Sequence, residues 1–249
     1  MHARAAGIEE PFLKLMPDFL EGVTLRGLAV LCADLVQKRE IPFAQKGERM
    51  VFYRRDIDAW ASQRILALPK PRLQGYHRQS SARVQDLSKQ RAVIPELIQA
   101  AGLEPALRSR TKASLLRDLV AVAERTGLVN DAKELLASLT ERERLGSTAL
   151  AGGVALLHPR THDPYRFADS FVAMGRAIQA VPFGSPDGTT TDLFFLICCQ
   201  NDRLHLHVLA RICMMCHHTN LLLSLREAAD SDEMLRCLNA AEQDVLRQM

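Results

Sequence analysis

The pattern of apolar and polar positions divides the chain into three parts. Residues 12–66 combine apolar spacings typical of helices with one short stretch typical of strands. Residues 70–91, KPRLQGYHRQSSARVQDLSKQR, hold few large apolar residues and several Gln and Ser, which predicts a linker. From residue 92 onward, amphipathic segments and apolar runs alternate. We therefore expect an N-terminal domain at 1–69, a basic linker at 70–91 and a larger domain at 92–249.

The first part predicts the order helix, helix, hairpin, helix. LRGLAVLCADLVQK has helical apolar spacing and ends before Ile41-Pro42, because proline disfavours helix at the preceding residue. FAQKGERMVFY predicts a two-stranded hairpin with its turn around residues 46–48. RRDIDAWASQRIL predicts a helix whose N-cap is Asp56.

The third part mixes predicted helices and strands. VIPELIQAAGL, KASLLRDLVAVAERTG and NDAKELLASLTERERLG predict helices, the second ending at Gly127 and the third starting at Asn130-Asp131. GGVALLH and TDLFFLICC predict buried strands. RLHLHVLARICMMCHHTNLLLSL and DSDEMLRCLNAAEQDVL then return to helical spacing. This mixture predicts a layered α/β arrangement.

Composition places the protein among soluble globular proteins. Apolar residues make up 47% and charged residues 24% of the chain. No run approaches the roughly 20 apolar residues that cross a bilayer. The N-terminus, MHARAAGIEEPFLKLMPDFLEG, has acidic residues and proline where a signal peptide needs an apolar stretch. We expect a cytoplasmic protein without membrane contact, whose six cysteines are free thiols.

The positive charge is concentrated in the linker. Residues 1–69 carry 10 Lys/Arg and 9 Asp/Glu, residues 70–91 carry 6 and 1, and residues 92–249 carry 16 and 19. The linker therefore carries +5, against +3 for the whole chain. Two interpretations stay open, a solvated loop and a strap that contacts phosphates beside a DNA-binding domain.

Residues 213–218, CMMCHH, contain the C-x-x-C-H spacing of haem attachment. Covalent haem requires export, and a structural zinc site normally shows two ligand pairs. Cys198-Cys199 are adjacent on a predicted strand, where neighbours point to opposite faces. Leu209, Ile212, Cys213 and Cys216 share one helix face, which predicts buried hydrophobes. A metal or haem protein is thus the weakest interpretation, and we expect no cofactor and no metal.

TERERLGSTALAGGVALLHPR carries the candidate chemistry. His158 stands just past a predicted strand and beside a loop of small residues, where it would be rigidly held. A neutral imidazole is a nucleophile near pH 7, and phosphoryl transfer to it needs positioning and charge stabilisation. A structural histidine at the strand end remains the other interpretation. His162 is expected to be an exposed loop histidine, and His207 is turned about 200° from His205 on a helix.

Residues 12–66, most firmly 40–66, resemble the excisionase-type winged helix-turn-helix domains. The match consists of Ile41-Pro42, Gly47 and VFYRRDIDAW. The resemblance implies a wing that contacts the DNA backbone through Lys46, Arg49, Arg54 and Arg55. The segment in the place of the recognition helix, TLRGLAVLCADLVQK, is longer and more apolar than in that family, and it offers only Arg26, Gln37 and Lys38 to base edges. Weak DNA binding, its loss and a dimer contact all stay open.

Residues 92–246 resemble the type-2 enzyme IIA domain of the phosphoenolpyruvate-dependent phosphotransferase system, in its mannitol/fructose and nitrogen-regulatory forms. The residues that match the first family motif, in order, are Arg142, Glu143, Ser147, Thr148, Gly153, Val154, Ala155 and His158. A second motif, VPFGSPDGTTTDLFFLICCQNDRLHLHVLARI, follows at the family's spacing and places His205 as the second histidine of the site.

The resemblance implies an α/β (α+β) three-layer sandwich with a mixed sheet, preceded by the small winged helix-turn-helix domain. It implies that His158 accepts phosphate from a histidine phosphocarrier protein and passes it to an enzyme IIB partner or holds it as a signal. His205 would steady the phosphoryl group, and Arg142 and Thr148 would line the pocket. The family usually has proline before the histidine, where this chain has Leu157.

Two functions of different kinds follow. The first is a phosphoryl-carrier and regulatory protein with phosphotransferase-type chemistry. The alternative is a DNA-binding transcriptional regulator whose enzyme IIA-like domain only senses or dimerises. The chain shows no enzyme IIB cysteine loop and no enzyme IIC span, which favours regulation or carriage in trans over transport. The sugar or target downstream and the formation of a homodimer are left open.

Overall fold

The computed structural model describes residues 35–38, 40–46, 49–66, 94–161 and 166–248. The chain divides into two compact units, residues 1–64 and 65–249. The linker expected at 70–91 and most of the helix expected before Ile41 lie outside the described residues.

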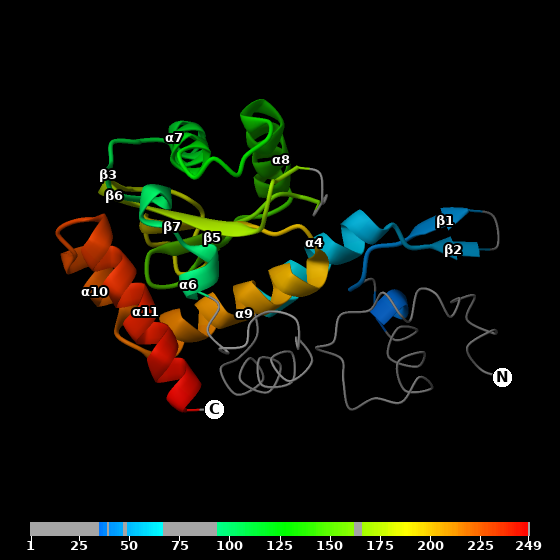
Figure 1. The fold of residues 1–249 in the computed structure, drawn as a ribbon. Coiled ribbons are helices and arrows are strands. Elements are labelled where there is room, and N and C mark those ends of the chain that lie inside the picture. Colours follow the sequence, from blue (N-terminus) through cyan, green and yellow to red (C-terminus); the bar gives the residue numbers. More distant parts are fainter. Residues whose placement is uncertain (1–34, 39, 47–48, 67–93, 162–165, 249) are drawn as a thin grey trace. The chain divides into compact units, whose positions relative to one another are not determined.

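In the first unit, a two-stranded hairpin is followed by a helix (Figure 1). Strands β1 (Ala44–Lys46) and β2 (Arg49–Val51) pair antiparallel, which confirms the predicted hairpin. Helix α4 (Arg54–Leu66) begins two residues before Asp56. The prediction that Asp56 is the N-cap is therefore wrong, because the Tyr53 carbonyl already accepts the first helical hydrogen bond, from Ile57 N at 3.1 Å.

The second unit is built on a five-stranded mixed sheet with the order β3-β6-β7-β5-β4. The pairs β3–β6 and β5–β7 are parallel, and the pairs β6–β7 and β4–β5 are antiparallel. This mixed sheet confirms the expectation from the family resemblance. The strands are β3 (Leu103–Leu107), β4 (Ala149–Leu150), β5 (Val154–Leu157), β6 (Phe171–Val181) and β7 (Thr191–Cys198).

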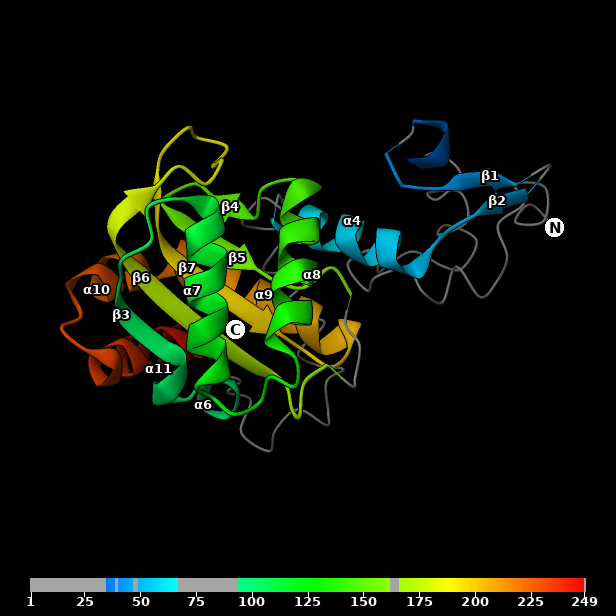
Figure 2. The same cartoon turned by 90° about the horizontal axis from the view of Figure 1, so that it is seen from above.

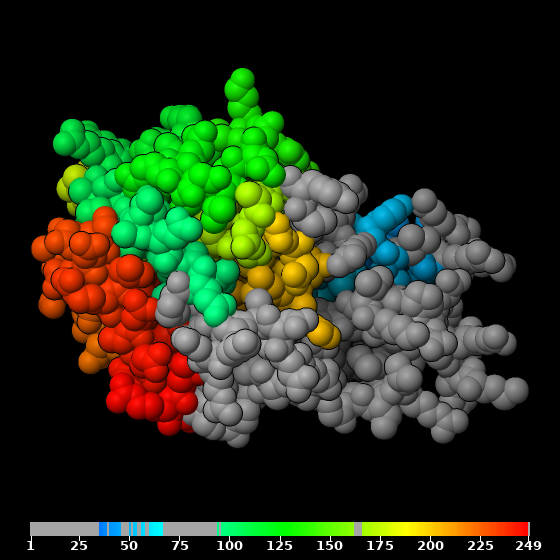
Figure 3. Space-filling model, in the orientation of Figure 1, coloured from blue at the N-terminus to red at the C-terminus, as the bar shows by residue number. Residues whose placement is uncertain are grey.

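Helices cover both faces of this sheet (Figure 1). On one face α7 (Lys112–Glu124) and α8 (Ala132–Arg144) lie side by side (Figure 2). On the other face lie α9 (Asp202–His218), α10 (Leu221–Glu227) and α11 (Ser231–Arg247). Figure 3 shows the side chains of the two helical layers, green for α7 and α8 and orange to red for α10 and α11.

Side-chain caps start the long helices of the second unit. Thr111 and Ser114 form a capping box on α7, and Asp131 accepts from the first backbone N–H groups of α8. Asp230 caps α11 in the same way. Gly127, after the end of α7, has a φ of +73°, the left-handed conformation that glycine adopts without strain.

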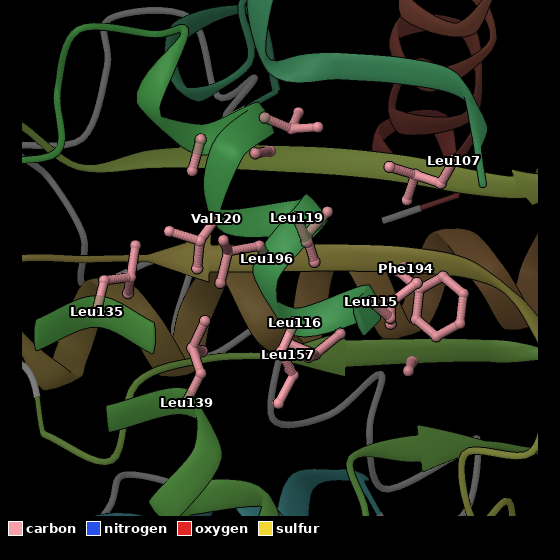
Figure 4. Close-up of a cluster of buried hydrophobic side chains, with 14 of the residues drawn as sticks. Leu107, Leu115, Leu116, Leu119, Val120, Leu135, Leu139, Leu157, Phe194 and Leu196 are labelled. Carbon is pink, nitrogen blue, oxygen red and sulfur yellow. The ribbon is translucent and has the colours of Figure 1, made fainter. Parts of the chain in front are cut away.

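One hydrophobic cluster of the second unit lies between the α7/α8 layer and the sheet (Figure 4). Leu115 and Leu119 from α7 and Leu139 from α8 meet Phe194 and Leu196 from β7, and all five are at most 2% exposed. Burial of apolar surface on this scale is the main favourable term in folding. Leu157 at the end of β5 belongs to the same cluster, so this packing joins the end of β5 to α7 and α8.

Two features of the second unit differ from what the sequence predicts. VIPELIQAAGL is not one helix, because α6 covers only Ile94–Leu97 and a 3₁₀ turn (η2, Ala100–Gly102) leads into β3. The longest strand, β6, was not expected. After His205, helix α9 ends at His218 and helix α10 begins at Leu221.

No single helix among the described residues is long and apolar enough to cross a membrane. Helices α9 and α10 reach the length and hydropathy of a membrane span only when the two are taken together, and the chain bends by 83° between them.

Candidate functional site

The candidate site begins at the carboxyl end of β5, where His158 follows Leu157. A tight turn at Gly152-Gly153 starts this strand, and Gly153 has a φ of +80°. A Cβ atom at Gly153 would lie 2.7 Å from Nη2 of Arg226. Arg226 is held there by Asp192, with Nε 2.7 Å from Oδ2, and by the Gly152 carbonyl at 2.7 Å. Glycine is therefore needed at the start of β5, because a side chain at position 153 would collide with the Arg226–Asp192 ion pair that packs there.

His205 lies at the same end of the sheet, in the helix that follows the neighbouring strand β7. Because β5 and β7 are parallel, their carboxyl ends meet at one edge of the sheet. Helix α9 follows β7, its N-cap Asn201 accepts from Leu204 N at 2.9 Å, and His205 stands in its first turn. The ring centroids of His158 and His205 are 4.7 Å apart, at an interplanar angle of 50°. His158 is 2% exposed and His205 is fully buried.

Arg142 joins the pair from the last turn of α8. Its Nε donates to His158 Nε2 at 3.0 Å, and its Nη1 donates to the Gly146 carbonyl at 3.0 Å. Burial lowers the pKa of Arg142 below its ordinary value, while the neighbouring Glu143 carboxylate raises it. The buried Nη2 has no hydrogen-bond acceptor within the part of the chain that the structure describes.

These contacts define which nitrogen of His158 carries the proton. Nδ1 lies 3.0 Å from the Leu156 carbonyl, which can only accept, so Nδ1 is assigned the N–H. Nε2 then receives the Arg142 hydrogen bond on its lone pair. The imidazole is thereby held with an unprotonated Nε2 directed at a guanidinium.

Glu143 connects α8 to the loop before β4. Its carboxylate accepts from the Thr148 hydroxyl at 2.8 Å and from Thr148 N at 3.2 and 3.3 Å. It also pairs with Lys112 Nζ at 3.0 Å. That ammonium lies 4.3 Å from the ring centroid of Phe183, within reach of a cation–π interaction. Glu143 itself is 9% exposed.

Of the residues expected at the site from the sequence, His158, His205 and Arg142 lie together. Thr148, which lies between Arg142 and His158 in sequence, is fully buried, and its hydroxyl donates to Glu143. Glu143 lies in the sequence motif but has no predicted role there, and neither Lys112 nor Phe183 is predicted from the sequence. No local pattern marks the last two, since they come from the start of α7 and from the loop before β7.

The other predicted residues divide between described and undescribed parts. Lys46 ends β1, Arg49 begins β2, and Arg54 and Arg55 open α4, while residues 47–48 between the strands lie outside the described residues. The wing and its contact with DNA stay predictions. His162 lies outside the described residues.

CMMCHH forms the end of α9. Leu209, Ile212, Cys213 and Cys216 are all buried, as the helical spacing predicts. Burial raises the pKa of Cys216 to about 12, so the thiol is held in its neutral form. Within the described ranges, no group of three or more His, Cys, Asp or Glu side chains is arranged to hold a metal ion.

A second buried group of charged and titratable side chains lies farther along α9. Arg211 and Glu242 of α11 are 1% and 0% exposed in their side chains, with Nη1 2.6 Å from Oε1. Glu242 Oε2 also accepts from Ile94 N at 3.0 Å. His207 is 3% exposed, and burial, with Arg211 second, lowers its pKa to about 4. Its side chain is therefore neutral at physiological pH.

Comparison with known proteins identifies relatives of the second unit. A nitrogen regulatory protein of Bradyrhizobium diazoefficiens is 30% identical over 148 residues, which are 58% of this chain and 94% of that protein. The fructose-specific EIIABC component of Bacillus subtilis is 26% identical over 148 residues, which are 59% of this chain and only 23% of that relative.

Solved structures show the same fold. Nitrogen regulatory protein IIA-Ntr from Neisseria meningitidis aligns with a TM-score of 0.54 and 25% identity, covering 59% of this chain and 99% of that one. IIA-mannitol in its complex with phosphorylated IIB-mannitol from Escherichia coli aligns with a TM-score of 0.51 and 19% identity, covering 57% and 97%.

The family model that matches the sequence spans residues 96–241, which hold the sheet, its two helical layers and the His158–His205–Arg142 group. The match covers more than half of the chain, so this protein belongs to the EIIA 2 family of the phosphoenolpyruvate-dependent sugar phosphotransferase system.

Proposed function

We propose that His158 is the residue on which this protein carries a phosphoryl group, and that Nε2 is the atom that bears it. As a member of its family, the chain is a phosphoryl-carrier, regulatory protein of the phosphotransferase system. The observation that carries the assignment to His158 is the Nε2–Arg142 hydrogen bond beside a proton-bearing Nδ1.

The transfer needs little from the protein beyond position and charge. The hydrogen bond from Arg142 Nε to His158 Nε2 breaks, and the freed Nε2 lone pair attacks the phosphorus of a donor phosphohistidine. The new N–P bond forms as the donor's N–P bond breaks, and the donor imidazole leaves with the bonding pair. Arg142 then gives its Nε–H and the unused Nη2–H to phosphoryl oxygens, which stabilises the charge that develops on them.

Two further groups support this chemistry. The Leu156 carbonyl keeps the proton on Nδ1 and so keeps Nε2 available as a nucleophile. The His205 ring, 4.7 Å away between centroids, stands beside the imidazole and would steady the phosphoryl group. Thr148 acts indirectly, because its hydroxyl holds Glu143, the neighbour of Arg142.

Leu157 stands before His158 where the family usually has proline, and it is compatible with a rigidly positioned histidine. Leu157 is 1% exposed and is paired in register with Leu196 of β7. The strand therefore continues to the residue before His158, and the histidine is positioned by strand pairing. Pro159 restricts the backbone on the other side.

The partners follow from the carrier role. The donor would be a histidine phosphocarrier protein, and the acceptor an enzyme IIB-type protein or a regulatory target. The related structure that contains phosphorylated IIB-mannitol and the relative named EIIABC support the second partner. The comparisons give no support to the alternative of a DNA-binding regulator.

A labelling assay tests the assignment. Incubation with labelled phosphoenolpyruvate, enzyme I and the phosphocarrier should place label on the wild-type protein, and ³¹P NMR should show phosphohistidine substituted at Nε2. His158→Ala should abolish the label, and His205→Ala should weaken it.

His217→Ala, at the end of α9, removes a histidine outside the site and should label like wild type. A wild-type protein that takes no label would remove the carrier role and favour the regulator. A labelled His158→Ala variant would move the phosphoryl group to another residue.

A further inference from the structure

A cavity of about 300 Å³ lies between α7 and α8, beside the site but outside the group of residues that would carry the phosphoryl group. This volume is at the lower end of the range of small-molecule pockets. Figure 2 shows the two helices side by side over the sheet. The cavity is lined by Lys112, Ala113, Leu116 and Arg117 of α7 and by Leu136, Thr140, Glu143 and Arg144 of α8.

The lining combines an apolar part with an excess of positive charge. Leu116 is 4% exposed and Leu136 packs against the core, so both belong to the hydrophobic layer beneath the helices. The Thr140 hydroxyl donates to the Leu136 carbonyl at 2.7 Å, which satisfies it within its own helix. An apolar chain or ring can therefore enter without leaving this hydroxyl unpaired.

Three cations line the cavity, against one carboxylate. Glu143 is already bonded to Lys112 and to Thr148. Arg117 and Arg144 are exposed, and they form no ion pair with the residues that the structure describes. An anion at the mouth would thus meet two guanidinium groups, whose planar fork suits a carboxylate or a phosphate.

We propose that this cavity is a binding site for a small anion with an apolar body, of the size of a medium-chain carboxylate. The body lies between α7 and α8 against Leu116 and Leu136. The anionic group lies between Arg117 and Arg144. A neutral molecule of the same shape binds more weakly, because it leaves the two cations without a partner.

The position of Lys112 connects this ligand to the phosphoryl site, and this second step rests on the proposed function. Lys112 lines the cavity and also forms an ion pair with Glu143. The Glu143 carboxylate accepts a hydrogen bond from Thr148, and Glu143 is the chain neighbour of Arg142. An anion held between Arg117 and Arg144 brings a negative charge into the cavity that Lys112 also lines, and this charge competes with Glu143 for the Lys112 ammonium. The bond from Thr148 N to the carboxylate, 3.2 Å in this structure, reports that competition directly.

Amide NMR of the full chain tests binding, with octanoate as the probe and 1-octanol as the neutral probe of equal length. We expect saturable shifts at residues 112–117 and 136–144 with octanoate, and a shift of the Thr148 amide. Octanol should bind at least about fivefold more weakly, as expected for the loss of contacts to two exposed cations.

Two variants locate the site. Arg117→Gln with Arg144→Gln should weaken octanoate binding about fivefold and bring it to the level of octanol. Ala113→Phe places a ring at the cavity and should abolish the localised shifts. Arg110→Gln with Lys133→Gln removes two exposed cations elsewhere on the same layer and should leave binding unchanged.

Equal affinity for octanoate and octanol, or full binding to Ala113→Phe, would overturn the proposal. The same holds for scattered shifts without saturation, which indicate binding at high concentration only. Localised shifts without a change at Thr148 would overturn the connection to the phosphoryl site. None of these measurements uses the phosphorylated protein, so a failure here is separable from a failure of His158 to take label.

Discussion

At the scale of single residues, Arg142 joins α8, the Gly146 turn and His158 through one guanidinium. It is 1% exposed, so water is not available to replace these hydrogen bonds. Arginine can bond both partners and still hold Nη2 available because its five N–H donors are held in one plane.

We predict that Arg142→Lys slows phosphoryl transfer to His158 by about 10²-fold, the usual cost of losing one such donor in a transfer site. A lysine ammonium is a point charge and cannot bond His158 Nε2 and Gly146 O while also reaching a phosphoryl oxygen. The initial rate of labelling from the phosphocarrier measures the effect. Arg110→Lys, on the surface before α7, is the matched control, and an unchanged rate for Arg142→Lys would contradict the role of Arg142.

His207 gives a pH dependence of stability at the same scale. Its pKa is lowered to about 4 in the folded protein, first by burial and then by Arg211, from an ordinary value of 6.5. The unfolded chain therefore binds a proton between pH 6.5 and 4 that the folded chain does not bind. Stability is unaffected above this window and falls as the pH falls through it, by up to about 3 kcal/mol from this residue.

Urea unfolding at pH 7 and pH 5 measures this loss of stability. His207→Gln removes the titrating group and should reduce the difference in unfolding free energy between the two pH values. His217→Gln, at the partly exposed end of the same helix, should keep the slope of the wild type. An equally steep loss in His207→Gln would assign the effect to other groups.

At the scale of elements, the buried Arg211–Glu242 pair ties α9 to α11 and to the backbone of α6. Helix α9 carries His205, so this tie helps to set the position of the second histidine. Such a pair is costly to break because one charge is then left in a site that excludes water.

We predict that Glu242→Gln lowers the free energy of unfolding by about 3 to 5 kcal/mol. The amide keeps an acceptor for Ile94 N but loses the charge opposite Arg211. The double variant Arg211→Leu, Glu242→Leu removes both charges and should recover much of the loss. Denaturant titration of the three proteins measures this, and a double variant no more stable than Glu242→Gln would show that the pair is not the cause.

Several elements follow from local sequence, and others do not. Helices α7, α8 and α11 are marked by apolar periodicity and by the caps Thr111, Asp131 and Asp230. Strand β6 has no such mark, because its residues alternate irregularly and include Gly175 in the middle. Its place depends on β3, since a Cβ atom at Gly175 would lie 2.2 Å from Leu107 Cδ1. That contact joins positions far apart in the chain.

At the scale of the whole molecule, a hairpin and a helix precede the enzyme IIA domain in sequence. Within the first unit, the Trp60 indole donates to the Glu40 carbonyl at 2.6 Å, and Arg64 pairs with Glu40 at 2.5 Å. These contacts hold α4 against the segment before the hairpin. The excisionase-like interpretation of this unit stays a prediction.

That interpretation predicts a mobility shift of duplex DNA that weakens steeply as salt is added, because phosphate contacts release counterions. Arg54→Ala with Arg55→Ala should weaken the shift about equally for all DNA sequences, as expected of backbone contacts. Arg110→Ala, in the second unit, is the control. The absence of a shift at low salt would assign the N-terminal unit to protein contacts.

By itself, the sequence determined the helix boundaries that are capped, the two buried strands and the order of the motif residues. These features rest on local preferences, which act between residues a few positions apart. The tertiary structure alone decided the rest. It brought Arg142, His158 and His205 from three elements to one sheet edge, placed Lys112 on Glu143, and opened a cavity between α7 and α8. Contacts of this kind depend on how layers pack, because burying the apolar faces of α7, α8 and the sheet brings distant residues together.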